Sequence, residues 1–265
     1  MNKKFILFIP FITMLIFTGC DYENNNCYIL NDNNYKKVER EQTIIEDVSG
    51  LEELEIINGV GNIEIKTTNS DKLRIKAKKI ANATSDVIAK ELLDVIDVKA
   101  FKVGNKISVK AVYTNNEKKD IWELKSEKYD CGDLEITYVI EMPSNIGKIT
   151  LETDVGNVKL IDVKGMFNVK TGVGNIYGNN IIPVKNSNFN SGTGNAKIKF
   201  ANLEESDIID VNCGVGNIKL IIPKDAKCTI EKEEFMKDKT RQEINGGGVL
   251  IKVEVSTGDI EIEQE

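Results

Sequence analysis

The sequence predicts an all-β protein: a right-handed β-solenoid built from coils of roughly 20 residues, with one short helix near the N-terminal end. The first observation behind this prediction is a glycine-rich turn that recurs six times. The second is its spacing, because from Gly156 onward the next central glycine follows after 18, 20, 22 and 42 residues, the last interval fitting two coils of 21. The third is the alternation of apolar and charged residues after each turn, which is typical of a strand with one buried face.

Each turn combines glycine with a polar residue that tolerates a left-handed backbone. The central glycine permits a positive φ and a close approach between coils, and the Asn or Asp that follows suits the same turn. Asparagines stacked at about 4.8 Å predict a ladder of side-chain hydrogen bonds. The six pairs of central glycine and polar residue are Gly61 and Asn62, Gly156 and Asn157, Gly174 and Asn175, Gly194 and Asn195, Gly216 and Asn217, and Gly258 and Asp259.

Stacking of the coils is predicted to be obligatory. Ordering the backbone of one coil of this length costs about 20–40 kcal/mol. The few Val, Ile or Leu side chains that one coil buries return only about 1.5–3 kcal/mol each. A single coil therefore cannot fold alone, and hydrogen bonds and buried surface between coils must supply the difference.

The first 19 residues have the pattern of a leader peptide. Lys3 and Lys4 precede an apolar stretch, Phe5–Phe17, which has roughly 13 residues against the ~20 that a membrane-spanning helix needs. The four residues that end at Cys20 read Phe-Thr-Gly-Cys and resemble the lipobox of bacterial lipoproteins. The resemblance implies cleavage before Cys20, acylation of Cys20 with chains such as palmitate, and anchorage to the extracytoplasmic face of the cell membrane. The alternative is an ordinary secretory leader.

The chain after the leader is predicted to have two parts. Residues 20–42 are rich in Asn and Asp and form a polar tether that buries little surface, and residues 43–265 form the repeat domain. An insertion at about residues 80–130 separates the first turn from the others. Within it, apolar residues at helical spacing predict a short helix with Ser85 as its N-cap, and a Gly-Asn pair at residues 104–105 predicts a hairpin.

The repeats, the early helix and two similar strand-to-turn segments resemble a known group of proteins. The two segments are residues 138–145 and 220–226, in each of which a strand ends at a proline, a position that suits a residue without a backbone N–H. With the repeated turns, they make residues 44–265 similar to the bacterial “putative adhesin” family of β-solenoid domains, whose function is unknown. The resemblance implies a solenoid with an adhesion-like role, and it carries over no catalytic residue.

The composition argues against several kinds of chemistry. Histidine, the commonest general base and a common zinc ligand, is absent, and the net charge of −7 argues against nucleic acid as a partner. The turn at Gly172 and Gly174 leads into a strand, so it presents no helix N-terminus to a phosphate. We therefore predict no enzyme activity and no cofactor. Two alternatives stay open, a β-helix enzyme that acts on polysaccharides and a calcium ion bound at the turns.

Cysteines other than Cys20 have two possible roles. After export they could form disulfides, or they could stay unpaired as small core residues, and the sequence does not distinguish these two roles. These four cysteines are Cys27, Cys131, Cys213 and Cys228. Cys213 lies three residues before a central glycine, a position that other repeats fill with Thr153, Thr171 and Ser191. A structural role is therefore predicted for Cys213.

The charged segment 115–130 is predicted to be an exposed loop, and its aromatic residues Trp122 and Tyr129 are the candidate partner contacts. The alternative for Trp122 is that it folds back onto the end of the solenoid. The predicted partners are the membrane, through the lipid, and an envelope or extracellular protein or glycan. The predicted function is a lipid-anchored cell-surface protein with a non-enzymatic binding, adhesion-like or scaffolding role, and the alternative is an envelope-sensing partner of a membrane protein.

Overall fold

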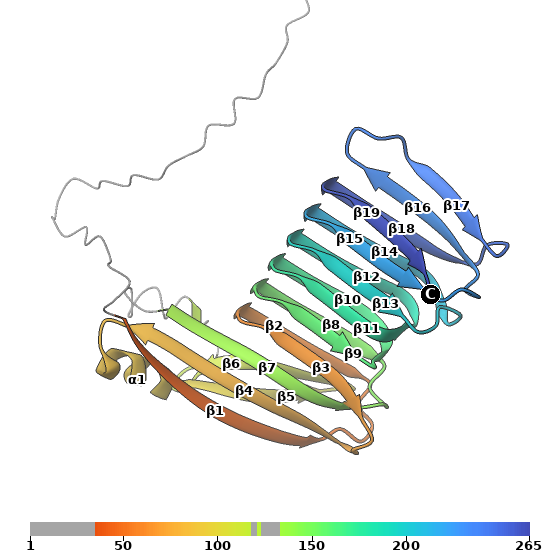
Figure 1. Ribbon diagram of the computed structural model, residues 1–265. Helices are drawn as coiled ribbons and strands as arrows, with labels where there is room; N and C mark the ends of the chain where they lie inside the picture. Colours follow the sequence, from red (N-terminus) through yellow and green to blue (C-terminus); the bar gives the residue numbers. More distant parts are fainter. Residues whose placement is uncertain (1–34, 118–120, 123–132) are drawn as a thin grey trace, which may run out of the picture. The chain divides into compact units, whose positions relative to one another are not determined.

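The computed structural model describes residues 35–117, 121–122 and 133–265 (Figure 1). Outside the described residues lie the predicted leader and most of the predicted tether, together with Cys20, Cys27, Tyr129 and Cys131. No helix among the described residues is both long and apolar enough to cross a bilayer.

Most of the described residues form strands of two sheets that share one core. Sheet A contains, in spatial order, β1 (Lys36–Asp47), β4 (Lys72–Ala83), β7 (Asp133–Pro143), β3 (Ile63–Thr68), β9 (Val158–Ile161), β11 (Ile176–Pro183), β13 (Ala196–Phe200), β15 (Ile218–Ile222) and β19 (Ile260–Gln264). Sheet B contains, in spatial order, β5 (Ile96–Val103), β6 (Lys106–Tyr113), β2 (Glu53–Val60), β8 (Lys148–Val155), β10 (Lys164–Val173), β12 (Lys185–Thr193), β14 (Ser206–Val215), β18 (Val249–Thr257), β16 (Cys228–Glu234) and β17 (Thr240–Ile244).

Six pairs of consecutive strands are each joined by one repeated turn, and we call each such pair a rung. The rungs are β2–β3, β8–β9, β10–β11, β12–β13, β14–β15 and β18–β19. Neighbouring rungs pair in parallel, and the residue before the central glycine is matched from rung to rung: Val60, Val155, Val173, Thr193, Val215 and Thr257. The all-β class with one helix, α1 (Asp86–Asp94), is confirmed, and the handedness of the coils stays a prediction.

The prediction that the 42 residues before the last turn form two coils is wrong. β18 pairs directly with β14, so the turn at Gly258 belongs to the rung next to the turn at Gly216. The residues between them include the antiparallel hairpin β16–β17, which lies beyond β18. The chain therefore leaves β15, passes over the neighbouring rung to form β16 and β17, and returns to fill that rung last.

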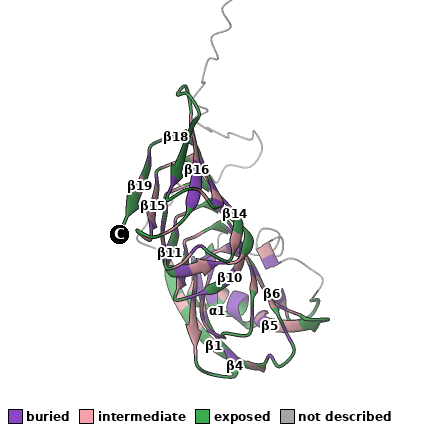
Figure 2. Ribbon diagram, turned by 90° about the vertical axis from the view of Figure 1, so that its right-hand side faces the viewer, coloured by how far each residue is buried: buried purple, intermediate pink, exposed green. Residues whose placement is uncertain are grey.

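The core follows from the alternation of the strands. In β10, for example, every second residue from Gly165 to Thr171 is buried, and one continuous apolar cluster extends from Val48 to Ile260. The rings of Phe167 and Phe189 have centroids 5.5 Å apart, a contact that adds roughly 0.5–1.5 kcal/mol beyond the area that it buries. Figure 2 shows exposed residues at the connections between strands, as in the β5–β6 hairpin.

The N-terminal part of the domain corrects the predicted tether. Residues 36–42 belong to β1, which pairs antiparallel with β4. Their alternate side chains are half-buried, and Gln42 both donates to the carbonyl of Val98 at 2.9 Å and accepts from its N–H at 3.1 Å. A charged strand of this kind lacks the apolar alternation that marks the other strands, which is why its composition suggested a tether.

The predicted helix and hairpin lie where the sequence placed them. The Ser85 hydroxyl accepts a hydrogen bond from the N–H of Ile88 at 3.3 Å, as an N-cap does, and α1 buries Ala89, Leu92 and Leu93. The β5–β6 hairpin turns at residues 104–105, where Gly104 has a φ of 62°.

Candidate binding surface on the stacked turns

The repeated turns form one edge of the stack, which we call the turn edge. Its spacing is set by backbone contacts between rungs. The φ of Gly174 is 157°, and a Cβ atom at this position would lie 1.9 Å from the carbonyl oxygen of Gly156 in the preceding rung. A side chain here would force the two rungs apart, so the glycine is required both for its backbone conformation and for the close approach.

A ladder of asparagine hydrogen bonds runs along the turn edge. The Asn157 Oδ1 accepts from the backbone N–H of Asn175 at 2.9 Å and from its Nδ2 at 2.9 Å. The Asn175 Oδ1 accepts in the same way from Asn195, at 2.8 Å and 3.2 Å. The ladder begins at Asn62 and ends at Asp259, whose backbone N–H donates to the Asn217 Oδ1 at 2.9 Å. Each rung thus satisfies a polar group of the next one.

A second row of side chains lies on the buried side of the turns. Three hydroxyl groups each donate to the carbonyl of a central glycine in the preceding rung: Thr153 to Gly61 at 3.1 Å, Thr171 to Gly156 at 2.9 Å and Ser191 to Gly174 at 2.8 Å. Cys213 is matched with Ser191 in this row and is buried. Its place in the register supports the predicted structural role.

Cys213 and Cys228 are both unpaired thiols in the structure. Burial raises the pKa of the Cys213 thiol to about 11, which opposes thiolate formation near neutral pH. Burial also raises the pKa of Cys228. Neither thiol is therefore a ready nucleophile.

The exposed side of the turn edge carries a row of β-branched residues. Val155, Val173 and Val215 are 46%, 53% and 51% exposed, and Thr193 and Thr257 are exposed at the equivalent positions of their rungs. Because the rungs pair as neighbouring strands, their separation is about 4.8 Å. The turn edge therefore presents aliphatic side chains in a line, beside the line of asparagines.

Trp122 lies at the first rung of the turn edge. A Cβ atom at Gly59 would lie 2.4 Å from the Cε2 atom of the Trp122 indole, so the indole fills the space above this glycine. Trp122 is half-buried and packs against the core, and its neighbour Ile121 is only 2% exposed. The folded-back alternative holds for Trp122, and the expected exposure of the loop is wrong for Ile121. Tyr129 lies outside the described residues.

The last rung also borders exposed apolar residues. Phe235 and Met236, at the tip of the β16–β17 hairpin, are 68% and 91% exposed, and the N–H of Phe235 donates to the carbonyl of Val255 in β18 at 3.3 Å. The sequence does not point to these two residues as a surface feature, because the spacing of the turns predicts regular coils where the hairpin lies.

Acidic and thiol side chains do not gather into a metal site in the part of the chain that the structure describes. There, no three side chains of Cys, Asp or Glu lie together in a way that could hold an ion. A calcium site made of backbone carbonyls and Asn side chains, considered from the sequence, stays a prediction.

Comparisons with known proteins give the following likenesses. No family model and no curated protein matches the chain. Among solved structures, a “putative cell adhesion protein” from Clostridium sporogenes is 13% identical, with 86% of this chain and 100% of that chain covered and a TM-score of 0.44. A “putative adhesin” from Bacteroides fragilis is 13% identical, with 84% and 97% covered and a TM-score of 0.33. A “putative lipid binding protein” from Parabacteroides distasonis is 11% identical, with 84% and 94% covered and a TM-score of 0.30.

Proposed function

We propose that this protein is a lipid-anchored, non-enzymatic cell-surface protein, and that its right-handed β-solenoid presents the turn edge to an envelope or extracellular partner. The observation that carries this proposal is the row of exposed valines. Apolar side chains in contact with water are ordinary when scattered, but a continuous line of them marks an interaction surface. On this protein the line consists of Val155, Val173 and Val215, with the methyl group of Thr193 between the second and the third, and the backbone register of the rungs fixes their positions.

The geometry supports a binding role through its rigidity. A surface whose side chains are held in place loses little conformational entropy when a partner docks. The asparagine ladder and the hydroxyl row tie every turn to the next, so the valines are presented on a preformed surface. Trp122 at one end and Phe235 at the other add aromatic surface, the residue class that contributes most to binding energy.

The contact surface is tested by removing its methyl groups. In the chain released by Cys20→Ser, Val155, Val173 and Val215 are changed to Ser together, and binding of the labelled protein to intact bacterial cells is measured by flow cytometry. We expect affinity to fall at least about tenfold, equivalent to ~1.4 kcal/mol.

The matched control removes equally exposed apolar side chains from elsewhere on the domain. Its positions are Ile45, Val87 and Val103, which are 52%, 64% and 72% exposed. The control triple variant is expected to bind as the parent does. Equal loss in both triple variants, or no cell binding by the parent, would contradict the proposed contact surface.

The lipid anchor is tested separately at Cys20. Changing Cys20 to Ser removes the thiol that would be acylated, so the protein is expected to move from the membrane fraction to the medium. The matched control is Cys27→Ser, which lies a few residues further along and should leave the protein with the membrane. Continued membrane fractionation of the Cys20→Ser variant would show that the anchor is not at this residue.

A further inference from the structure

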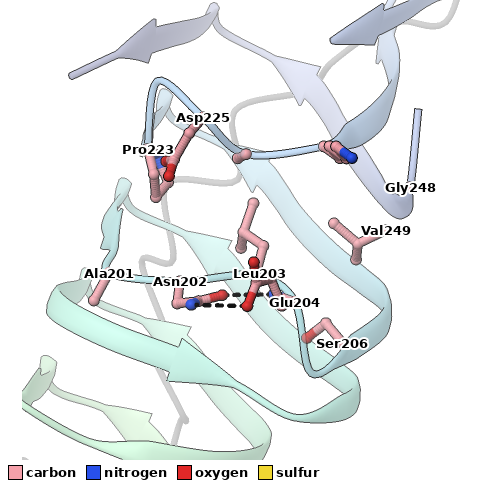
Figure 3. Close-up of a pocket in the computed structure, with 11 residues that line it drawn as sticks. Ala201, Asn202, Leu203, Glu204, Ser206, Pro223, Asp225, Gly248 and Val249 are labelled. Carbon is pink, nitrogen blue, oxygen red and sulfur yellow. Dashed lines mark hydrogen bonds between the residues drawn. The ribbon is translucent and has the colours of Figure 1, made fainter. Parts of the chain in front are cut away.

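A pocket of about 330 Å³ lies at the edge of the stack opposite the turn edge (Figure 3). It is bounded by residues 201–206, which connect β13 to β14, and by residues 223–227, which connect β15 to β16. Gly248 and Val249, at the start of β18, close one side. We call it the corner pocket.

The corner pocket exists because the chain skips the rung β18–β19 when it goes from β15 to β16. β14 is followed in sheet B by β18 and then by β16, so the connection from β15 to β16 must climb two strand spacings, about 10 Å. The connection at residues 201–205 climbs only one spacing, from β13 to β14. A space as wide as one connection is therefore left between these two connections. The path of the chain, and not the rotamer of one side chain, sets the size of this space.

The pocket has an apolar floor and a polar rim. Leu203 and Val249 are only 3% and 8% exposed. On the rim, the Asn202 Oδ1 accepts from the backbone N–H of Glu204 at 2.7 Å, and the Asn202 Nδ2 lies 3.5 Å from the Glu204 Oε2 (Figure 3). This turn holds the Glu204 carboxylate at the mouth of the pocket.

Further polar groups complete the rim. Asp225 and Lys227 are exposed on the connection that faces Glu204 across the pocket. The Ser206 Oγ is buried and has no hydrogen-bond partner among the described residues, which is uncommon for a buried hydroxyl. The pocket thus brings together two carboxylates, one ammonium group, one amide and one unpaired hydroxyl.

We propose that the corner pocket binds a neutral sugar unit, such as the terminal residue of a glycan. Carboxylates accept hydrogen bonds from neighbouring sugar hydroxyls, an ammonium and an amide donate to them, and an apolar floor suits the C–H face of a pyranose ring. One positive and two negative side chains disfavour an acidic sugar. The volume lies near the lower limit for ligand pockets, roughly 300–1,000 Å³, which suits one or two rings.

This inference goes beyond the proposed function, because it concerns a different edge of the stack and does not depend on the valine row. It is tested on the Cys20→Ser chain with glucose, galactose and N-acetylglucosamine as probes, by saturation-transfer NMR and isothermal titration calorimetry. Glycine and glutamate serve as charged probes that lack a pyranose ring. We expect at least one of the sugars to bind with a Kd of about 1 mM or lower.

Two variants locate the site. Asp225→Asn and Lys227→Met are expected to raise the Kd about tenfold or more, since each removes a charged hydrogen-bonding group from the rim. Asp207→Asn is the matched control, because Asp207 is exposed at the start of β14, next to Ser206, but does not line the pocket. Unchanged thermal unfolding of all three variants would show that the fold is retained.

The results that would overturn the inference are distinct from those that bear on the turn edge. Absence of binding by all three sugars, binding of glycine or glutamate in their place, or sugar binding that Asp225→Asn and Lys227→Met leave unchanged would each reject a neutral-sugar site. The valine triple variant should keep full sugar affinity while it loses cell binding.

Discussion

The two edges of the stack are built from the same strands but differ in how their connections are fixed. At the turn edge every rung uses the same short turn, and each turn bonds to the next through its backbone and its Asn side chain. At the opposite edge the connections differ, with left-handed non-glycine residues at Asp162 and Lys185. Regular turns are tied to their neighbours and cannot vary singly, whereas the irregular edge can change locally and so can accommodate a pocket.

The strongest test of this contrast replaces a glycine at each edge. Gly174→Ala places a Cβ atom 1.9 Å from the carbonyl oxygen of Gly156 at a φ of 157°, and the clash and backbone strain should cost about 2–6 kcal/mol. Gly147→Ala at the opposite edge meets no atom within 4 Å and has no positive φ, so its effect should be within about 1 kcal/mol. Urea unfolding measures both. Similar losses in the two variants would contradict the contrast.

The next test uses pH and the thiol in the buried row. The pKa of Cys213 is raised from an ordinary value of 9.0 to about 11, so the folded state holds this proton more tightly than the unfolded state. Stability should therefore be intact below pH 9 and should fall by about 2–3 kcal/mol as the pH rises through 11. In Cys213→Ser the hydroxyl does not titrate, and this part of the alkaline loss should disappear. Identical pH profiles of unfolding would exclude the effect.

A smaller effect is expected from breaking the asparagine ladder. Asn175→Ala removes the acceptor of the Asn195 N–H and the donor to Asn157, which should cost about 1–3 kcal/mol. The comparison at the other edge is Asn180, whose Nδ2 donates to the Asp162 Oδ1 on the surface at 2.6 Å. Removing that bond with Asp162→Gly, which keeps the left-handed backbone of residue 162 (φ 53°), should change the free energy of unfolding by less than about 1 kcal/mol. Chemical denaturation of both variants checks that the free energy of unfolding falls more at the turn edge than at the opposite edge.

The smallest expected effect is a gain at the end of the ladder. The Asp259 carboxylate accepts but cannot donate, so only the backbone N–H of Asp259 bonds to the Asn217 Oδ1. Asp259→Asn supplies an Nδ2 group that can donate to Asn217, as the Nδ2 groups of Asn157, Asn175 and Asn195 do to their preceding rungs, and should stabilise the protein by about 0.5–1 kcal/mol. The exposed ion pair with Lys237, at 3.7 Å, contributes little to the balance. A loss of stability would show that the ladder does not extend to this rung.

Local features of the fold could be predicted from the sequence, because each depends on neighbouring residues. The turn at Gly174 and Asn175, the N-cap at Ser85 and the role of Cys213 all follow from short patterns whose physics is local. The stacking of the turns follows from their repetition. These features include most of the turn edge but not Phe235 and Met236, which join it only through the hairpin.

Features that depend on the chain path could not be predicted in the same way. The length of the 42-residue interval fits two coils as well as one coil with an inserted hairpin. The signal that separates them is a negative one, because residues 217–245 contain no glycine and so no second turn. The corner pocket depends on that hairpin, so it was invisible as well. β1 was missed for a different reason, since its half-buried side chains, such as Arg40 and Gln42, are polar.

The rung β18–β19, which the chain forms after the hairpin β16–β17, also fixes the order in which the last strands can join the stack. Among the described strands, β16 pairs only with β17 and with β18, so the hairpin has no place on the stack until residues 249–257 arrive. Those residues follow the hairpin in the chain, so they are synthesised after it. The hairpin therefore stays unattached to the stack until β18 is in place. A chain cut after Gly248 would keep the hairpin residues but lose the strand that attaches them.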